Sequence, residues 1–99
     1  MIHKQVLEFI SHFSSAQDCF LYGCCYWFAM ILKTRFLSCA KCELMYHIVD
    51  NHFATMIDGE LYDASGHISS VGFIPWDQVY ETDSLLFSRI VRDCILMED

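Results

Sequence analysis

Two adjacent cysteines, Cys24 and Cys25, follow Gly23 within an uncharged run that extends from Cys19 to Leu32. The positive end of a helix dipole lowers the pKa of a cysteine in the first helical turn, and a neighbouring imidazole lowers that pKa further. Only a thiolate attacks a carbonyl carbon readily, so a cysteine at such a position is suited to be a nucleophile. The simpler interpretation is an inert core thiol, because free cysteine is among the most buried residue types.

A predicted β-hairpin supplies an imidazole and a carboxylate that could act on this thiol. Asp58-Gly59 is typical of a two-residue turn in which both residues have positive φ. This turn fixes the strand register, which pairs Ile57 with Glu60, Met56 with Leu61, Thr55 with Tyr62, and Ala54 with Asp63.

In that register His52 and Asp63 are diagonal neighbours on one face of the hairpin, with the small Ala54 between them. Diagonal neighbours have backbones roughly 7–8 Å apart, which is within side-chain reach. The carboxylate can hold one imidazole nitrogen and leave the other as a base. If the helix that Cys25 opens packs on the face carrying His52, the three residues form a Cys–His–Asp triad. Without that contact, His52 is a structural histidine and Asp63 a turn-former.

The remaining elements follow from hydrophobic periodicity and turn residues. A first amphipathic helix is predicted by the helical spacing of Ile2, Val6, Phe9, Ile10 and Phe13. A loop follows at residues 14–18. The second helix runs from about Cys24 to Phe36, ends in the cations Lys33 and Arg35, and is apolar nearly all round, so we expect it to be buried on most faces.

From residue 43 the period changes to that of strands, which we expect at residues 43–49, 52–57 and 60–63. Residues 67–74 fit either a further strand or an irregular loop. Pro75 is suited to the first turn of a short helix that ends near Tyr80. Ser84 opens a last helix with Leu86, Ile90, Val91 and Cys94 inward. The order predicts a single α+β domain over residues 1–99, in which an N-terminal helix pair packs on a small antiparallel meander and a C-terminal helix follows.

Three segments in the same order resemble the signatures of small papain-like cysteine hydrolases. Gly23-Cys24-Cys25-Tyr26-Trp27-Phe28-Ala29 resembles their G-x-C-Y-x-F-A helix start, His52-Phe53-Ala54 their H-aromatic-small strand, and Leu61-Tyr62-Asp63-Ala64-Ser65-Gly66 their Y-D-x-x-G strand end. The resemblance covers about residues 20–66 and implies a papain-like α+β fold.

By position, the resemblance makes Cys25 the nucleophile, because Cys25 directly precedes Tyr26. It makes His52 the base and Asp63 the residue that orients the imidazole. The family also has an oxyanion donor just upstream of the nucleophile, and Gln17 and Tyr22 are the candidates for this role beside the Cys25 amide.

The composition limits the other classes of function. The formal charge is −7, and residues 50–99 hold ten acids against Arg89 and Arg92, so we expect no direct binding of nucleic acid. The longest uncharged run has fourteen residues, fewer than the roughly 18 of a membrane span. The first five residues lack the basic and then apolar pattern of a secretory leader.

The six cysteines are better interpreted as reduced thiols of a cytoplasmic protein than as a disulfide framework, because the chain has one proline and four glycines and a high apolar content. Cys39-Ala40-Lys41-Cys42 is a lone CxxC motif. Zinc would need two further ligands, for which only His47 and Cys19 lie near, so we expect no metal and no cofactor.

The sequence therefore predicts a small papain-like thiol hydrolase or acyltransferase, such as a cysteine peptidase or amidase, that acts on a peptide, an isopeptide or a small acyl-amide. The alternative is a non-enzymatic acidic protein that keeps the fold. One example would be an inhibitor encoded by a phage or mobile element that binds a basic, nucleic-acid-handling partner. A third possibility combines the two, with a degenerate triad that serves structure only.

Overall fold

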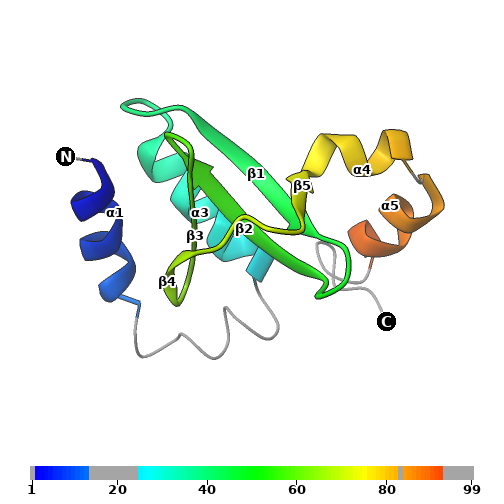
Figure 1. Cartoon of the computed structure of the whole chain (residues 1–99), viewed down its shortest axis with the longest axis horizontal. Helices are drawn as coiled ribbons and strands as arrows, with labels where there is room; N and C mark the ends of the chain where they lie inside the picture. The colour runs from blue at the N-terminus through cyan, green and yellow to red at the C-terminus, as the bar shows by residue number, and fades with distance from the viewer. Residues whose placement is uncertain (1, 14–24, 83, 93–99) are drawn as a thin grey trace.

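The computed structural model describes residues 2–13, 25–82 and 84–92. Within these residues the helices α1 (Ile2–Ser11) and α3 (Cys25–Phe36) come first. They are followed by the strands β1 (Cys42–His47), β2 (His52–Ile57), β3 (Glu60–Asp63), β4 (Gly66–Ile68) and β5 (Phe73–Pro75), and then by the helices α4 (Trp76–Thr82) and α5 (Ser84–Ile90). Helix α3 lies along the sheet, with α1 on one side and α4 and α5 at the opposite end (Figure 1). The predicted α+β class is confirmed.

The five strands form one antiparallel sheet in the order β4-β3-β2-β1-β5. The first four strands make a meander, and residues 69–72 then cross the sheet so that β5 pairs with the far side of β1 (Figure 1). Residues 67–74 thus contain the end of one strand, a crossing segment and the start of another. Pro75 pairs with Met45 as the last residue of β5, and α4 begins one residue later than predicted. The edge position tolerates proline, which has no N–H to donate.

The β2–β3 turn has the geometry that its sequence predicts. Asp58 has φ 50° and Gly59 has φ 86°. The register Thr55–Tyr62, Met56–Leu61 and Ile57–Glu60 agrees with the prediction. The Asp58 carboxylate also accepts a hydrogen bond of 3.0 Å from the Lys41 amide, which ties this turn to the chain that enters β1.

The two faces of the sheet are both covered. Helix α3 packs on the face of Phe53, Thr55 and Ile57, where the buried Thr55 hydroxyl donates a hydrogen bond of 2.6 Å to the Ala29 carbonyl. The opposite face carries a smaller cluster, which consists of buried Met45, Ala54 and Leu61 with Met56, Ile68 and Phe73 packed against it. The crossing segment runs over this second face (Figure 1).

The buried positions of α1 follow its periodicity, because Val6 and Ile10 are in the core beside Phe28, Leu32 and Phe36 of α3. At the other end, α5 turns Ile90 inward as predicted and Arg89 outward, whereas Cys94 lies outside the described residues. These contacts place both ends of the described chain on the α3 side of the core.

The expectation that α3 is buried on most faces is wrong. The buried side chains Phe28, Ala29, Leu32 and Phe36 share one side of the helix, while Trp27 is 47% exposed and Ile31 is 36% exposed. A single sheet can cover only one side of a helix, and α1 covers only part of the rest. The apolar composition of α3 therefore overstates its burial.

Candidate active site

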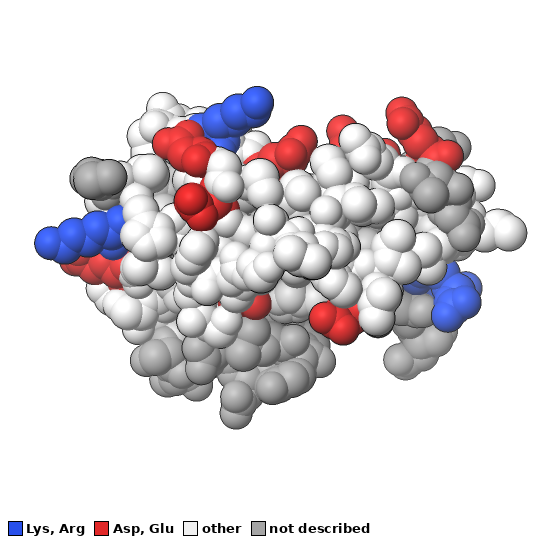
Figure 2. All heavy atoms as spheres, in the orientation of Figure 1, with Lys and Arg blue, Asp and Glu red and all other residues white. Residues whose placement is uncertain are grey.

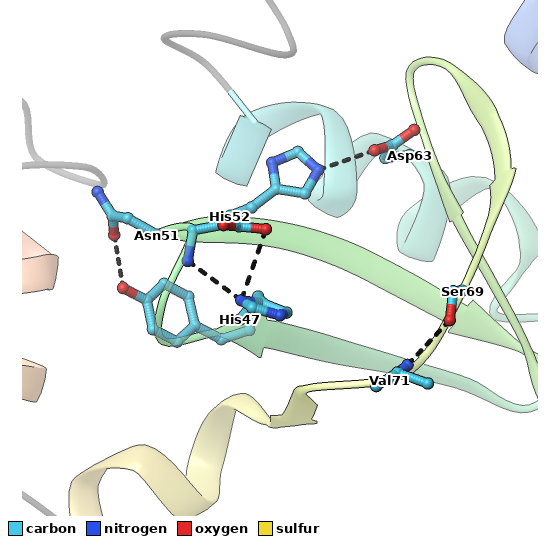
Figure 3. Close-up of polar contacts among 8 residues, drawn as sticks. His47, Asn51, His52, Asp63, Ser69 and Val71 are labelled. Atoms are coloured by element: carbon cyan, nitrogen blue, oxygen red, sulfur yellow. Dashed lines mark hydrogen bonds and ion pairs between the residues drawn. The ribbon is translucent and has the colours of Figure 1, made fainter.

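Cys25, His52 and Asp63 each stand at the end of an element. Cys25 is the first residue of α3, His52 the first of β2 and Asp63 the last of β3. The structure brings His52 and Asp63 together at the end of the β2–β3 hairpin away from its turn, and Cys25 shares a hydrogen bond with His52. His52 Nε2 lies 2.8 Å from Asp63 Oδ2, and the ring of His52 extends from the strand end toward Asp63 (Figure 3). Both side chains are largely buried, with exposed fractions of 17% and 9%.

Ser65 holds the second oxygen of the Asp63 carboxylate. Asp63 Oδ1 accepts a hydrogen bond of 2.7 Å from the Ser65 amide and one of 2.5 Å from the Ser65 hydroxyl. Burial by itself raises the pKa of Asp63. The hydrogen bonds from His52 and Ser65 outweigh burial and leave the pKa below its ordinary value. Asp63 is therefore an ionised and fixed partner for the imidazole at neutral pH.

His52 is held in its protonated form. The hydrogen bond with Asp63 contributes most and a hydrogen bond with Cys25 comes next. Together they outweigh burial and raise the pKa of His52 to about 9. Because Nε2 bonds Asp63, Nδ1 is the ring nitrogen left for Cys25. The ring thus links the carboxylate to the thiol.

The pKa of Cys25 is lowered, which favours the thiolate form. Burial raises its pKa, but the hydrogen bond with His52, the Phe53 backbone N–H and the attraction of the imidazolium outweigh burial, so the net shift is downward. The opposing shifts of Cys25 and His52 are those of a thiolate–imidazolium pair, whose two protons titrate as a coupled system.

The premise under which we expected this contact is wrong. Helix α3 packs on the face of Phe53 and Thr55, whereas His52 alternates with Ala54 and so belongs to the opposite face of β2. The contact forms because both residues are the first of their elements. At the strand end, no neighbouring residue of β2 separates the imidazole from the first turn of the helix.

Three contributions to the site have no counterpart in the sequence prediction. The Ser65 hydrogen bonds could have been anticipated, because an aspartate in a turn commonly accepts a hydrogen bond from the backbone N–H two residues later, and a serine at that position can also donate its hydroxyl. The Phe53 amide gives no sequence signal. Phe73, whose ring centroid lies 6.2 Å from that of His52, comes from the segment that sequence alone left undecided.

The other predicted residues fall in two groups. Gln17, Tyr22, Gly23 and Cys24 lie outside the described residues. The CxxC pair is described, and there Cys39 is exposed while burial and the neighbouring Cys39 and Asp58 raise the pKa of Cys42. The shift of Cys42 is opposite in direction to that of Cys25. Across residues 2–13, 25–82 and 84–92, no group of three or more His, Cys, Asp or Glu side chains could hold a metal ion.

The acidic excess of the chain is not concentrated on the described fold. Five of the thirteen acids lie outside the described residues, namely Asp18, Asp83, Asp93, Glu98 and Asp99. On the face drawn in Figure 2, acidic side chains are spread over the surface with basic ones among them. One acid of the described part, Asp63, is paired with His52.

A surface hollow of about 490 Å³ lies on the outer side of α3 and is lined by Trp27, Met30, Ile31, Thr34 and Arg35. Cys25 is not among its lining residues. In the part of the chain with described coordinates, no helix is both long enough and apolar enough to span a bilayer.

Comparison with known proteins yields a family but no characterised relative. Neither a curated protein nor a solved structure matches the chain. The family model described as "Phage YunG-like protein" matches residues 3–86, which include Cys25, His52, Asp63 and Ser65. The match spans most of the sequence, and the chain therefore belongs to the phage YunG-like protein family.

Proposed function

We propose that this protein is a small papain-like thiol hydrolase or acyltransferase that acts on an amide or related acyl bond. The observation that carries the proposal is the continuous chain of interactions from Asp63 through His52 to Cys25, in which the pKa of the imidazole is raised and that of the thiol is lowered. A cysteine that served only packing would gain nothing from an imidazolium held beside it.

In the first half of the reaction the Cys25 thiolate attacks the carbonyl carbon and the carbonyl oxygen takes the electron pair. When the tetrahedral adduct collapses, the bond from carbon to the leaving nitrogen breaks and His52 gives its proton to that nitrogen. The product is a thioester on Cys25 and a free amine. Asp63 keeps the ring oriented throughout and stabilises its charge.

In the second half His52, now neutral, takes a proton from water or from another acceptor, which attacks the thioester carbon. The carbon–sulfur bond breaks, the acyl product leaves, and the thiolate–imidazolium pair returns. The backbone N–H groups in the first turn of α3 lack intrahelical acceptors, so the Cys25 amide can donate to the oxyanion. Gln17 and Tyr22 are the candidates for a second donor.

Alkylation of the thiols tests the proposal without knowledge of the substrate. With limiting iodoacetamide at pH 7, peptide mapping should show Cys25 labelled at least about tenfold faster than Cys39 or Cys42, because an ordinary thiol is only a few per cent ionised at this pH. His52→Ala should remove the difference. Equal labelling of the three thiols in the wild type would refute the proposal.

A second experiment addresses acyl transfer directly. Incubation with p-nitrophenyl acetate should release p-nitrophenol in a burst and leave an acetyl group on Cys25 that mass spectrometry detects. Cys25→Ala should abolish both signals, and Cys42→Ala should leave both intact. A protein whose Cys25 is preferentially alkylated but never acylated would have an ionised thiol without acyl-transfer chemistry.

The alternative function is a non-enzymatic interaction protein that binds a basic partner. The net charge of −7 favours it, and the family description, which names phages, fits an origin in a mobile element. Binding to such a partner should weaken with salt and be unaffected by Cys25→Ala. Binding that is lost in Cys25→Ala would instead assign the interaction to the thiol site.

A further inference from the structure

The Asp63 carboxylate has a different partner on each oxygen. Oδ2 lies 2.8 Å from His52 Nε2, whereas Oδ1 accepts both the amide and the hydroxyl of Ser65. Ser65 follows Asp63 by two residues in the turn between β3 and β4 and is itself exposed. The donors that fix the buried carboxylate are thus supplied from the solvent side of the turn.

We infer that Ser65 is a positioning residue of the thiol site, which fixes the oxygen that Asp63 presents to His52 and keeps the carboxylate ionised. The inference rests on the proposed function, because it gives Ser65 a role in the chain of interactions from Asp63 through His52 to Cys25. Ser65 acts through Asp63 and does not touch the reacting atoms.

Two features of the geometry support this role. A carboxylate can rotate about its Cβ–Cγ bond, and two donors on Oδ1 hold the plane in which Oδ2 meets the ring. Asp63 is also buried, which makes the loss of a donor to its carboxylate costly. Loss of the Ser65 hydroxyl would leave Oδ1 with the amide alone.

Loss of the Ser65 hydroxyl should also affect the Cys25 thiol, through Asp63 and His52. A carboxylate with fewer donors is less readily ionised and holds the imidazolium less strongly. The proton affinity of His52 then falls, and the thiolate of Cys25 loses part of its counter-charge. A turn residue that served only the β3–β4 connection would change stability but would not change the titration of His52.

The matched variants are Ser65→Ala, which removes the hydroxyl, and Ser65→Thr, which keeps it and adds a methyl group at an exposed position. Ring-proton or ring-nitrogen NMR of His52 is the direct measurement. In the wild type the titration midpoint is expected at about 9. Ser65→Ala should lower it by about half to one pH unit, and Ser65→Thr should restore it.

Cys25 alkylation as a function of pH is the second measurement. In Ser65→Ala the thiolate should form at higher pH, with about a threefold to tenfold lower labelling rate at pH 6. Thermal unfolding of each variant confirms that the turn is intact.

The outcomes separate the two proposals. If Cys25 of the wild type is labelled preferentially while the His52 midpoint is the same in wild type and Ser65→Ala, the role of Ser65 is refuted and the thiol proposal stands. If wild-type His52 titrates near its ordinary pKa and Cys25 shows no preference, both proposals fail. A lowered midpoint in both Ser65→Ala and Ser65→Thr would also overturn the role of the hydroxyl.

Discussion

Replacing Cys25 by serine should make the stability of the protein fall with rising pH, although the wild type shows little such dependence from this site. Over the range in which Cys25 is ionised and His52 is protonated, the folded pair holds one proton. The unfolded chain holds one proton as well, on the thiol, because a free imidazole titrates near 6.5 and a free thiol near 8.5. Equal proton counts give no slope of the unfolding free energy with pH.

Serine removes the thiol proton from the unfolded state but leaves the hydrogen bond between His52 and Asp63. The folded variant then binds one proton more than the unfolded chain from pH 6.5 up to the remaining pKa of His52. The stabilisation is complete below 6.5, where both states are protonated, and is lost as pH rises through the folded pKa. Each pH unit removes about 1.4 kcal/mol. The wild-type value of about 9 sets the upper limit of the loss at about 3 kcal/mol.

Urea unfolding followed by the fluorescence of Trp27 and Trp76 measures this loss at pH 6 and pH 9. Comparison with the wild type cancels the titration of every other group. Adding Asp63→Asn to Cys25→Ser should abolish most of the slope, because the carboxylate is the main cause of the raised pKa of His52. Parallel pH profiles for Cys25→Ser and the wild type would show that Asp63 does not hold an imidazolium, and the electrostatic description of the site would be wrong.

Two further predictions concern the scaffold, and urea unfolding measures both. Thr55→Val keeps the shape of a fully buried side chain but removes its hydrogen bond to the Ala29 carbonyl, so the protein should lose about 1 kcal/mol; an unchanged stability would show that this bond contributes nothing net. Gly72→Ala should cost roughly 2 kcal/mol or more, because Gly72 has φ +87° and an added methyl group would lie 2.3 Å from His47 Nε2. Gly59→Ala is its control, since Gly59 has φ +86° with open space around it, and this substitution should cost only about 1 kcal/mol. Equal costs for the two variants would mean that the His47 side chain moves away from the new methyl group without a loss of stability.

The predictable part of this molecule is the part that local rules determine. The Asp58-Gly59 turn fixes a register, and the register brings His52 within reach of Asp63 without any knowledge of the rest of the fold. The helical periodicity of α1 likewise identified Val6 and Ile10 as core residues, because the spacing of apolar residues can be seen within a single segment of the sequence.

The less predictable part depends on contacts between segments. Helix α3 covers the face of the sheet that carries Phe53 and Thr55, which pack against it. No local sequence pattern predicts which of the two faces the helix covers. β4 and β5 have three residues each, which is too few to show an alternation of apolar and polar residues. Proline is common both in edge strands and in the first turn of a helix, so Pro75 does not distinguish between these structures. The papain-like assignment of the fold stays a prediction.

The crossing segment between β4 and β5 has a consequence for the order in which the chain assembles. The meander from β1 to β4 joins strands that are close in sequence, so the entropy lost in closing each loop is small. β5 can pair with β1 only after residues 69–72 have crossed the full width of the sheet. This pairing joins residues 45–47 to residues 73–75 and is the most distant in sequence among the described strands. We therefore expect His52 and Asp63 to be brought together early, when the β2–β3 hairpin forms. The cluster of Met45, Ala54 and Leu61 stays open to water until the crossing segment closes over it. A partly folded chain with the His52–Asp63 pair formed and β1 still an open edge is the species that we expect to aggregate. Phe73, which packs against this cluster from β5, is the residue at which to probe the late step.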